Sequence, residues 1–285
     1  MLTLHTPKQN QLLAPLPATD WECMLSRKTA LGNSLLAAVP RKEYRRLLPG
    51  LEAVTLSFGE VLYEPGDTIR HVYFPSVCLV SLLTRVDDHL ALEVGMVGYE
   101  GMVGIPLALR VRVSPFLALV RGSGLAMRME SEYFLKELRQ SMHLQHALYR
   151  YTDTLMAQVA QTAACNRFHV VQERLARWLL MTRDRVQSTD FHLTQEFLST
   201  MLGVRRVGVT KAAGQLQMRK LIEYSRGNIR IVDQHGLEAA ACSCYRAGRQ
   251  KHPLSTSPRA VIVAQPSANL RASKPRKPAA QASRT

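Results

Sequence analysis

The chain has 285 residues and a formal net charge of +15, with 37 Lys and Arg side chains against 22 Asp and Glu. Hydrophobic residues make up 46% of the sequence, enough to bury a core, and the length suits about two domains. The sequence contains no apolar run of the roughly 20 residues that span a membrane, and its start lacks the pattern of a secretory signal. Five cysteines are too few for a disulfide framework. We therefore expect a cytoplasmic protein without membrane contact, and the charge indicates a polyanionic partner, most often nucleic acid.

The positive charge is unevenly distributed along the chain. Residues 31–140 carry twelve basic and twelve acidic side chains, whereas residues 141–246 carry fourteen basic and eight acidic ones. Residues 1–30 form a weakly patterned extension, and residues 247–285 hold eight basic and no acidic side chains. We expect that last segment to be a disordered basic tail, because it is rich in Pro, Ala, Ser, Lys and Arg and lacks periodic apolar residues. A basic excess can also be a merely solvated surface.

The neutral region, residues 31–140, has the pattern of a small β domain. A short helix is expected first, at about residues 42–48. From residue 54 to residue 129, apolar and polar side chains alternate in short runs, which indicates strands with one buried face. Turn residues such as those at 64–67 separate the runs. Closely spaced short strands predict an antiparallel, jelly-roll-like β-barrel, and with the helices that follow the fold class is α+β.

After the barrel the apolar period becomes helical. A helix over residues 141–167 is predicted from apolar side chains at spacings of three and four, namely Leu144, Leu148, Tyr151, Leu155, Val159 and Thr162. So long and narrow a stripe is typical of the seam between two helices, and we expect this helix to hold a homodimer together. The alternative is a helix packed on its own barrel. A second helix is expected over about residues 169–185, and a polar connection over residues 186–191.

A winged helix-turn-helix is predicted within residues 168–236. Thr194 is a good N-cap for a short helix that Gly203 ends, and a second helix follows over about residues 205–219. The segment 222–232 reads as a β-hairpin with a tight turn, which would form the wing.

The basic residues of this module indicate double-stranded DNA as the partner. Arg205 and Arg206 are expected in the first turn of the second helix, where a structural helix prefers anions. That end of a helix-turn-helix meets base edges in the major groove, and either Arg can pair bidentately with guanine. The expected DNA contacts are Thr194, Gln195, Arg205, Arg206, Gly208, Thr210, Lys211 and Gln215. In the wing, Arg226 and Arg230 either contact phosphates or are merely solvated.

The order of these elements resembles the Crp–Fnr family of bacterial transcription regulators, over about residues 35–235. The resemblance is carried by LYEPGDTIRHVYF at 62–74, VQERLARWLLMTRDR at 171–185 and LTQEFLSTMLGVRRVGVTKAAGQLQMRKLI at 193–222. It implies a cyclic-nucleotide-binding-like sensor barrel over residues 31–140, a dimer helix and a winged helix-turn-helix that reads DNA. It also places Arg206 and Lys211 where the family has basic residues that contact bases or phosphates.

The sequence departs from the family pattern in both the barrel and the DNA module. Cyclic-nucleotide binders of the family hold the ribose with a glycine-flanked Glu and the cyclic phosphate with an Arg–Ser pair, but Ile105-Pro106 and Phe116-Leu117 stand here instead. An unpaired phosphate is costly to bury, so we expect no tight cyclic-nucleotide binding and no cofactor. A remaining effector pocket would be lined by Gly98, Gly101, Met102, Val103 and Gly104. In the DNA module Val207 replaces the family's common Glu, so the family's best-known DNA sequence is not expected.

The leading hypothesis is a homodimeric, sequence-specific regulator of a palindromic site, with RNA polymerase as a candidate further partner. A redox- or metal-responsive regulator would act through cysteines such as Cys242 and Cys244. Two cysteines are at most half of a tetrahedral zinc site and the histidines show no metal spacing, so no metal is expected. An enzyme would need a catalytic set, and none stands out. A winged helix that binds a protein partner would not need Arg205 and Arg206.

Overall fold

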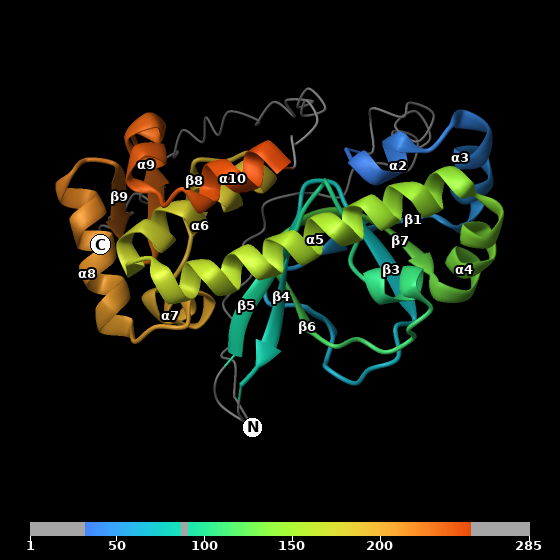
Figure 1. Cartoon of the computed structure of the whole chain (residues 1–285), viewed down its shortest axis with the longest axis horizontal. Helices are drawn as coiled ribbons and strands as arrows, with labels where there is room; N and C mark the ends of the chain where they lie inside the picture. The colour runs from blue at the N-terminus through green and yellow to red at the C-terminus, as the bar shows by residue number, and fades with distance from the viewer. Residues whose placement is uncertain (1–31, 87–90, 252–285) are drawn as a thin grey trace, which may run out of the picture.

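The structure, a computed structural model, describes residues 32–86 and 91–251. The predicted N-terminal extension and most of the predicted basic tail lie outside these residues. The described chain forms two antiparallel β-sheets, one long helix along them, and a mainly helical second unit at one end (Figure 1). The α+β class predicted from the sequence is confirmed.

The first unit contains two antiparallel sheets, with strand orders β1-β7-β3 and β2-β6-β4-β5. The strands are β1 (Glu52–Leu56), β2 (Val61–Tyr63), β3 (His71–Pro75), β4 (Leu79–Arg85), β5 (Ala91–Val97), β6 (Leu117–Gly122) and β7 (Gly124–Glu130). Helices next to them are α2 (Ser34–Ala38), α3 (Arg41–Leu47), α4 (Ser131–Gln140) and the 3₁₀ helices η1 (Leu48–Gly50) and η2 (Ile105–Leu109). The predicted jelly-roll-like arrangement is confirmed as two facing sheets, and the short helix expected at 42–48 is α3. Alternation did not reveal β2, which is three residues long, or β6.

The four-stranded sheet is buried on both faces, which the sequence pattern did not predict. The first five residues of β4 are all buried. Val80 and Leu82 face the core between the two sheets, whereas Leu79 and Leu83 join a second core with the helical unit. The expectation of one buried face is therefore wrong for β4, because the second unit covers the outer side of the sheet.

The long helix is α5 (Met142–Phe168), and it crosses almost the whole molecule (Figure 1). Leu144, Leu148, Tyr151 and Leu155 are buried in the core of the first unit. The predicted dimer seam is therefore wrong in its residues, because this stripe packs on the chain's own sheets. None of the helices within the described ranges, α5 included, combines the length and apolar character needed to cross a bilayer.

The second unit has its own small sheet, of order β8-β10-β9. Its elements are α6 (Val171–Val186), β8 (Asp190–His192), α7 (Gln195–Leu202), α8 (Arg206–Met218), β9 (Ile222–Ser225), β10 (Asn228–Ile231), α9 (Gln234–Ala240) and α10 (Cys244–Lys251). The connection expected to be only polar contains β8. The segment after the wing is also helical: α10 includes residues 247–251, which the sequence analysis assigned to the tail.

The predicted hairpin is confirmed as the pair β9 and β10, in which Ser225 lies opposite Asn228. The two residues between them have positive φ angles, 50° at Arg226 and 83° at Gly227. This is the combination that a two-residue type I′ turn requires. The turn leaves Arg226 exposed at the tip of the wing.

Four side chains, here called the interface quartet, join the two units: Glu93, Arg121, Trp178 and Phe197. The Trp178 indole N–H of α6 donates to the buried Glu93 carboxylate of β5 at 2.7 Å. The Arg121 guanidinium of β6 lies 4.1 Å from the centre of the Phe197 ring of α7, and that ring contacts Trp178 edge to face. Burial raises the pKa of Glu93 and lowers the pKa of Arg121 to about 10. The quartet therefore ties the strands to both helices by charge and by packing.

The double burial of β4 gives a testable expectation for stability. Leu83→Ala removes a side chain that is 1% exposed between the sheet and the helical unit. It should lower the free energy of unfolding by about 2–5 kcal/mol. Val77→Ala, at a side chain that is 56% exposed, is the control and should change it by less than about 0.5 kcal/mol. Urea unfolding followed by fluorescence measures both, and equal small losses would show that the outer face is not covered.

Candidate nucleic-acid interface

Helices α7 and α8 form the predicted helix-turn-helix. The Thr194 hydroxyl accepts the backbone N–H of Phe197 at 3.2 Å, so it caps α7 as expected. Gly203 ends the helix with a φ of 60°, a conformation that glycine adopts without strain. The apolar side chains that join α8 to the core are Val209, Ala212, Ala213 and Leu216.

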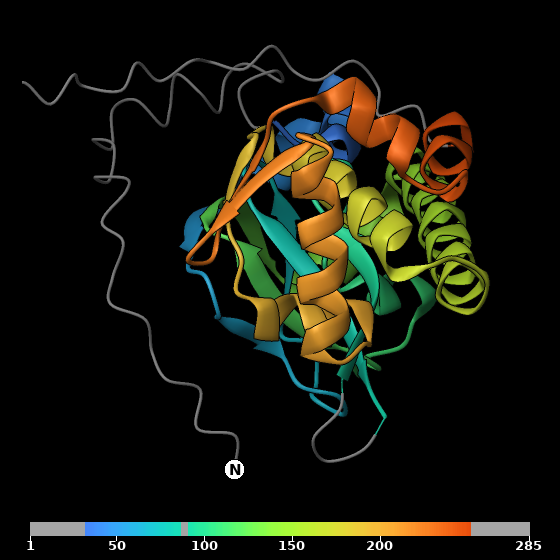
Figure 2. The ribbon, with the colours of Figure 1, turned by 90° about the vertical axis from the view of Figure 1, so that its left-hand side faces the viewer.

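The outer side of α8 lies at the surface at one end of the molecule, where Figure 2 shows it in orange in front of the sheets. Arg205, Arg206, Thr210 and Lys211 are exposed there. Arg205 is the N-cap and Arg206 the first helical residue, one position later than the sequence indicated. No acidic side chain occupies the first turn. Two cations at the positive end of a helix dipole are unfavourable alone, and an anionic partner removes that cost.

Gln195 links the two helices on this surface. Its side-chain oxygen accepts from the Thr210 hydroxyl at 2.9 Å and from Arg206 Nε at 3.4 Å. The start of α7 and the outward side of α8 therefore form one polar surface. Gly208 and Gln215 are half-buried beside it. All eight residues expected to contact DNA thus come from the same pair of helices.

The two wing arginines differ in their surroundings. Arg230 pairs with Asp190 at 2.7 Å and lies 3.9 Å from Glu223, so its charge is already offset. Arg226 lies exposed at the tip of the hairpin. Arg226 is therefore the better placed of the two to meet a phosphate.

The residues expected to line an effector pocket pack closely against other parts of the chain. These residues are Gly98, Gly101, Met102, Val103 and Gly104. Gly98 lies against the side chain of Arg185 of α6, and Gly101 against the ring of Tyr151 of α5, so neither position has space for a side chain. Met102 and Val103 are buried in the core. A cavity of about 630 Å³ lies elsewhere, between α5, α6 and α10, and none of the five residues lines it. This cavity is therefore not the predicted effector pocket, which stays a prediction.

Comparison with known proteins supports the helix-turn-helix. The family model of the Crp-like helix-turn-helix domain matches residues 173–240, from α6 to the end of α9. A search of curated proteins found no relative that matches the chain.

Solved structures resemble the chain over both units. A putative transcriptional regulator of the Crp/Fnr family from Eubacterium rectale has 15% identity and a TM-score of 0.58, covering 73% of this chain and 97% of its own. FixK2 from Bradyrhizobium japonicum has 13% identity and a TM-score of 0.58, covering 68% and 98%. CLP from Xanthomonas campestris, described as a c-di-GMP responsive global regulator, has 15% identity and a TM-score of 0.57, covering 67% and 99%.

At these identities the solved structures establish the fold, and the family model identifies the DNA-binding part. The chain therefore has the fold of the Crp/Fnr regulators, and its residues 173–240 are the Crp-like helix-turn-helix domain of a DNA-binding transcription regulator.

Proposed function

We propose that the protein is a homodimeric transcription regulator that reads a palindromic DNA site with α8 of each protomer. The observation that carries this proposal is the exposed pair Arg205 and Arg206 at the N-terminal end of α8, which no acidic residue in the first turn neutralises. Two such helices related by a two-fold axis would meet half-sites about 34–36 Å apart. Gln195, held by Thr210 and Arg206, adds the start of α7 to the same surface.

Selection of bound sequences from a random DNA library identifies the DNA site. The Arg206→Ala variant then tests whether Arg206 contacts a base of that site. This variant should weaken binding to the selected site by about 1–3 kcal/mol, because a bidentate guanine contact is lost, and should relax the preference at one base pair. Arg219→Ala removes the same charge at the other end of α8 and is the control. Fluorescence anisotropy measures both. Unchanged DNA affinity of the Arg206→Ala variant would favour the alternative of a winged helix used for protein contacts.

The homodimer part of the proposal rests on a face of α5 that does not contact the chain's own core. Met142, Tyr149 and Met156 follow one another at intervals of seven residues and are 65%, 51% and 67% exposed. Ala163 continues the series and is also exposed. A seven-residue apolar repeat along one helix is typical of a two-helix coiled contact. A second copy of α5 is therefore the occupant that fits this face.

A charge in the middle of this face should prevent dimer formation. Wild-type protein should sediment at twice the chain mass of 31.9 kDa, and Met156→Arg at the chain mass. Burying an unpaired guanidinium between two helices is costly, which is the physical reason. Val77→Arg places the same charge at an exposed position away from α5 and should remain dimeric. Analytical ultracentrifugation distinguishes these outcomes, and a dimeric Met156→Arg variant would place the interface elsewhere.

We further propose that the sensor unit does not bind cyclic nucleotides tightly. The segment that would cover a nucleotide is η2, in which Ile105, Leu107 and Ala108 are buried apolar residues. Two basic side chains nearby are engaged, since Arg112 pairs with Glu132 and Arg121 belongs to the interface quartet, whereas Arg110 at the end of η2 is exposed.

Isothermal titration calorimetry with cyclic AMP and with cyclic di-GMP should therefore show no binding in the micromolar range. Cyclic di-GMP is included because CLP, whose fold is similar, is described as responsive to it. Micromolar binding of either compound contradicts this part of the proposal and leaves the DNA-binding part standing.

A further inference from the structure

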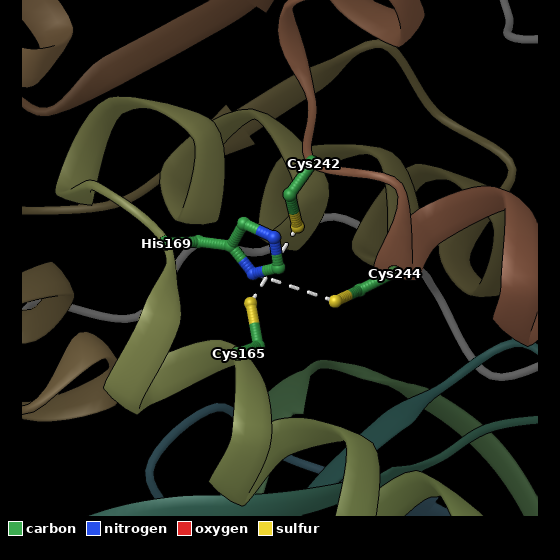
Figure 3. A group of neighbouring side chains, drawn as sticks. All are labelled: Cys165, His169, Cys242 and Cys244. Atoms are coloured by element: carbon green, nitrogen blue, oxygen red, sulfur yellow. Dashed lines mark hydrogen bonds between the residues drawn. The ribbon is translucent and has the colours of Figure 1, made fainter.

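Four potential metal ligands meet at the junction of the long helix with the end of the described chain. The side chains are Cys165, His169, Cys242 and Cys244, and their ligand atoms all lie within 4.8 Å of one another. The sulfurs of Cys165 and Cys242 are 3.5 Å apart, and the Cys244 sulfur is 3.5 Å from His169 Nδ1. In Figure 3 the imidazole of His169 points into the space between the three sulfurs. Cys242 and Cys244, which alone are at most half of a tetrahedral site, thus lie beside two further potential ligands, Cys165 and His169.

The cluster is assembled from two short sequence motifs. Cys165 lies in the last turn of α5, and His169 is the C-cap, whose backbone N–H bonds to the Cys165 carbonyl at 3.1 Å. One turn of helix thus places both side chains on the same side. Cys242 and Cys244 flank the start of α10. The three cysteines are 1% to 5% exposed and form a small core of their own.

The surroundings of the cluster suit a group with negative charge. Arg174 and Arg177 of α6 are buried, and the Nε of each lacks a hydrogen-bond partner. Both guanidiniums interact electrostatically with Cys165. A divalent metal ion bound by three thiolates and one neutral imidazole has a net charge of −1, which these arginines would offset.

We propose that Cys165, His169, Cys242 and Cys244 bind one zinc ion in a closed, tetrahedral Cys₃His site. Three thiolates and an imidazole are a ligand set of structural zinc sites, which leave no position open for a reactant. Zinc–sulfur bonds of about 2.3 Å place tetrahedral sulfurs about 3.8 Å apart, so the four side chains need only small shifts. Gln161 Nε2 donates to the Cys244 sulfur at 3.0 Å, and a hydrogen bond of this kind orients a metal ligand.

Two other interpretations of the cluster fit the positions of the four side chains less well. A disulfide between Cys165 and Cys242 would use two of the four groups and leave Cys244 and His169 without a role. An iron–sulfur cluster needs room for several iron and sulfide atoms between its ligands, whereas these four atoms lie within 4.8 Å of one another. A single ion satisfies all four side chains at once.

The site would fasten the chain that follows the wing to the end of α5. Zinc would join α5 to the loop between α9 and α10, and so hold α10 against α5 and α6. The metal would also fix the C-terminal end of α5. The exposed face of this helix is the proposed dimer contact, so the two proposals concern the same helix. The zinc proposal does not depend on DNA binding or on the dimer.

The metal content of the untagged, full-length protein tests the proposal directly. Protein purified under reducing conditions should contain one zinc ion per chain by inductively coupled plasma mass spectrometry. Replacement by cobalt should give the thiolate charge-transfer and tetrahedral d–d absorption bands of a Cys₃His site. Removal of the zinc by a strong chelator should lower the melting temperature, because a ligand that binds only the native state stabilises that state. Hydrogen exchange should then increase in residues 241–251 and stay unchanged in the sheets.

Variants locate the ion. Cys242→Ser and His169→Ala should each lose most of the bound zinc, whereas Cys78→Ser, which alters a cysteine buried in the other core, should retain it. If a ligand variant fails to fold, the wild-type zinc content and cobalt spectrum still decide. The proposal is overturned by wild-type protein that holds no zinc after refolding with it. It is also overturned by iron with acid-labile sulfide, or by a Cys165–Cys242 disulfide in freshly purified protein.

Discussion

The contact between Glu93 and Trp178 is the constraint on which the arrangement of the two units depends. A carboxylate that is 5% exposed would be costly to bury without partners. The Trp178 N–H and the Ser81 hydroxyl both donate to it, and the nearby charge of Arg121 favours its ionised form. Trp178 belongs to α6, so moving α6 away from the sheet would leave one buried oxygen of the Glu93 carboxylate without a hydrogen-bond donor. The sheets therefore specify where α6 lies, beyond what non-directional apolar packing specifies.

The position of the recognition helix follows from this placement of α6. Helix α8 packs on α6 and α7, and α7 packs against β5. Arg174 of α6 donates to the Leu202 carbonyl at the end of α7, and Phe197 of α7 lies under Arg121 of the sheet. A rotation of α8 relative to the sheets must repack the core that contains Leu83 and must also break or move the interface quartet. An effector would change DNA binding only if it bound the present arrangement and the rotated one with different affinities.

The sequence predicted best those elements whose signals are local. Thr194 and Gly203 bound α7 because capping depends on neighbouring backbone groups, and the turn at Arg226-Gly227 depends on two φ angles. The choice between the two faces of α5 was not local. Leu144 and its stripe entered the chain's own core, since packing within one chain avoids the entropy cost of association, and the face of Tyr149 and Met156 was left exposed. Periodicity identified the helix but did not show which face would pack where.

The cysteine cluster shows the same limit in a stronger form. The eight residues expected to contact DNA lie between positions 194 and 215, so one helix-turn-helix brings them together. Cys165 and Cys242 are 77 residues apart, and each of the motifs Cys165-x₃-His169 and Cys242-x-Cys244 supplies half of the proposed site. They meet only because α9 and α10 return along α6 after the wing, in a segment whose helices the sequence analysis did not anticipate. Apolar side chains such as Leu237, Ala240 and Tyr245 already hold this segment in the core that contains α6, and the proposed metal ion would add to that hold. A site of this kind can be recognised only once the tertiary fold is known.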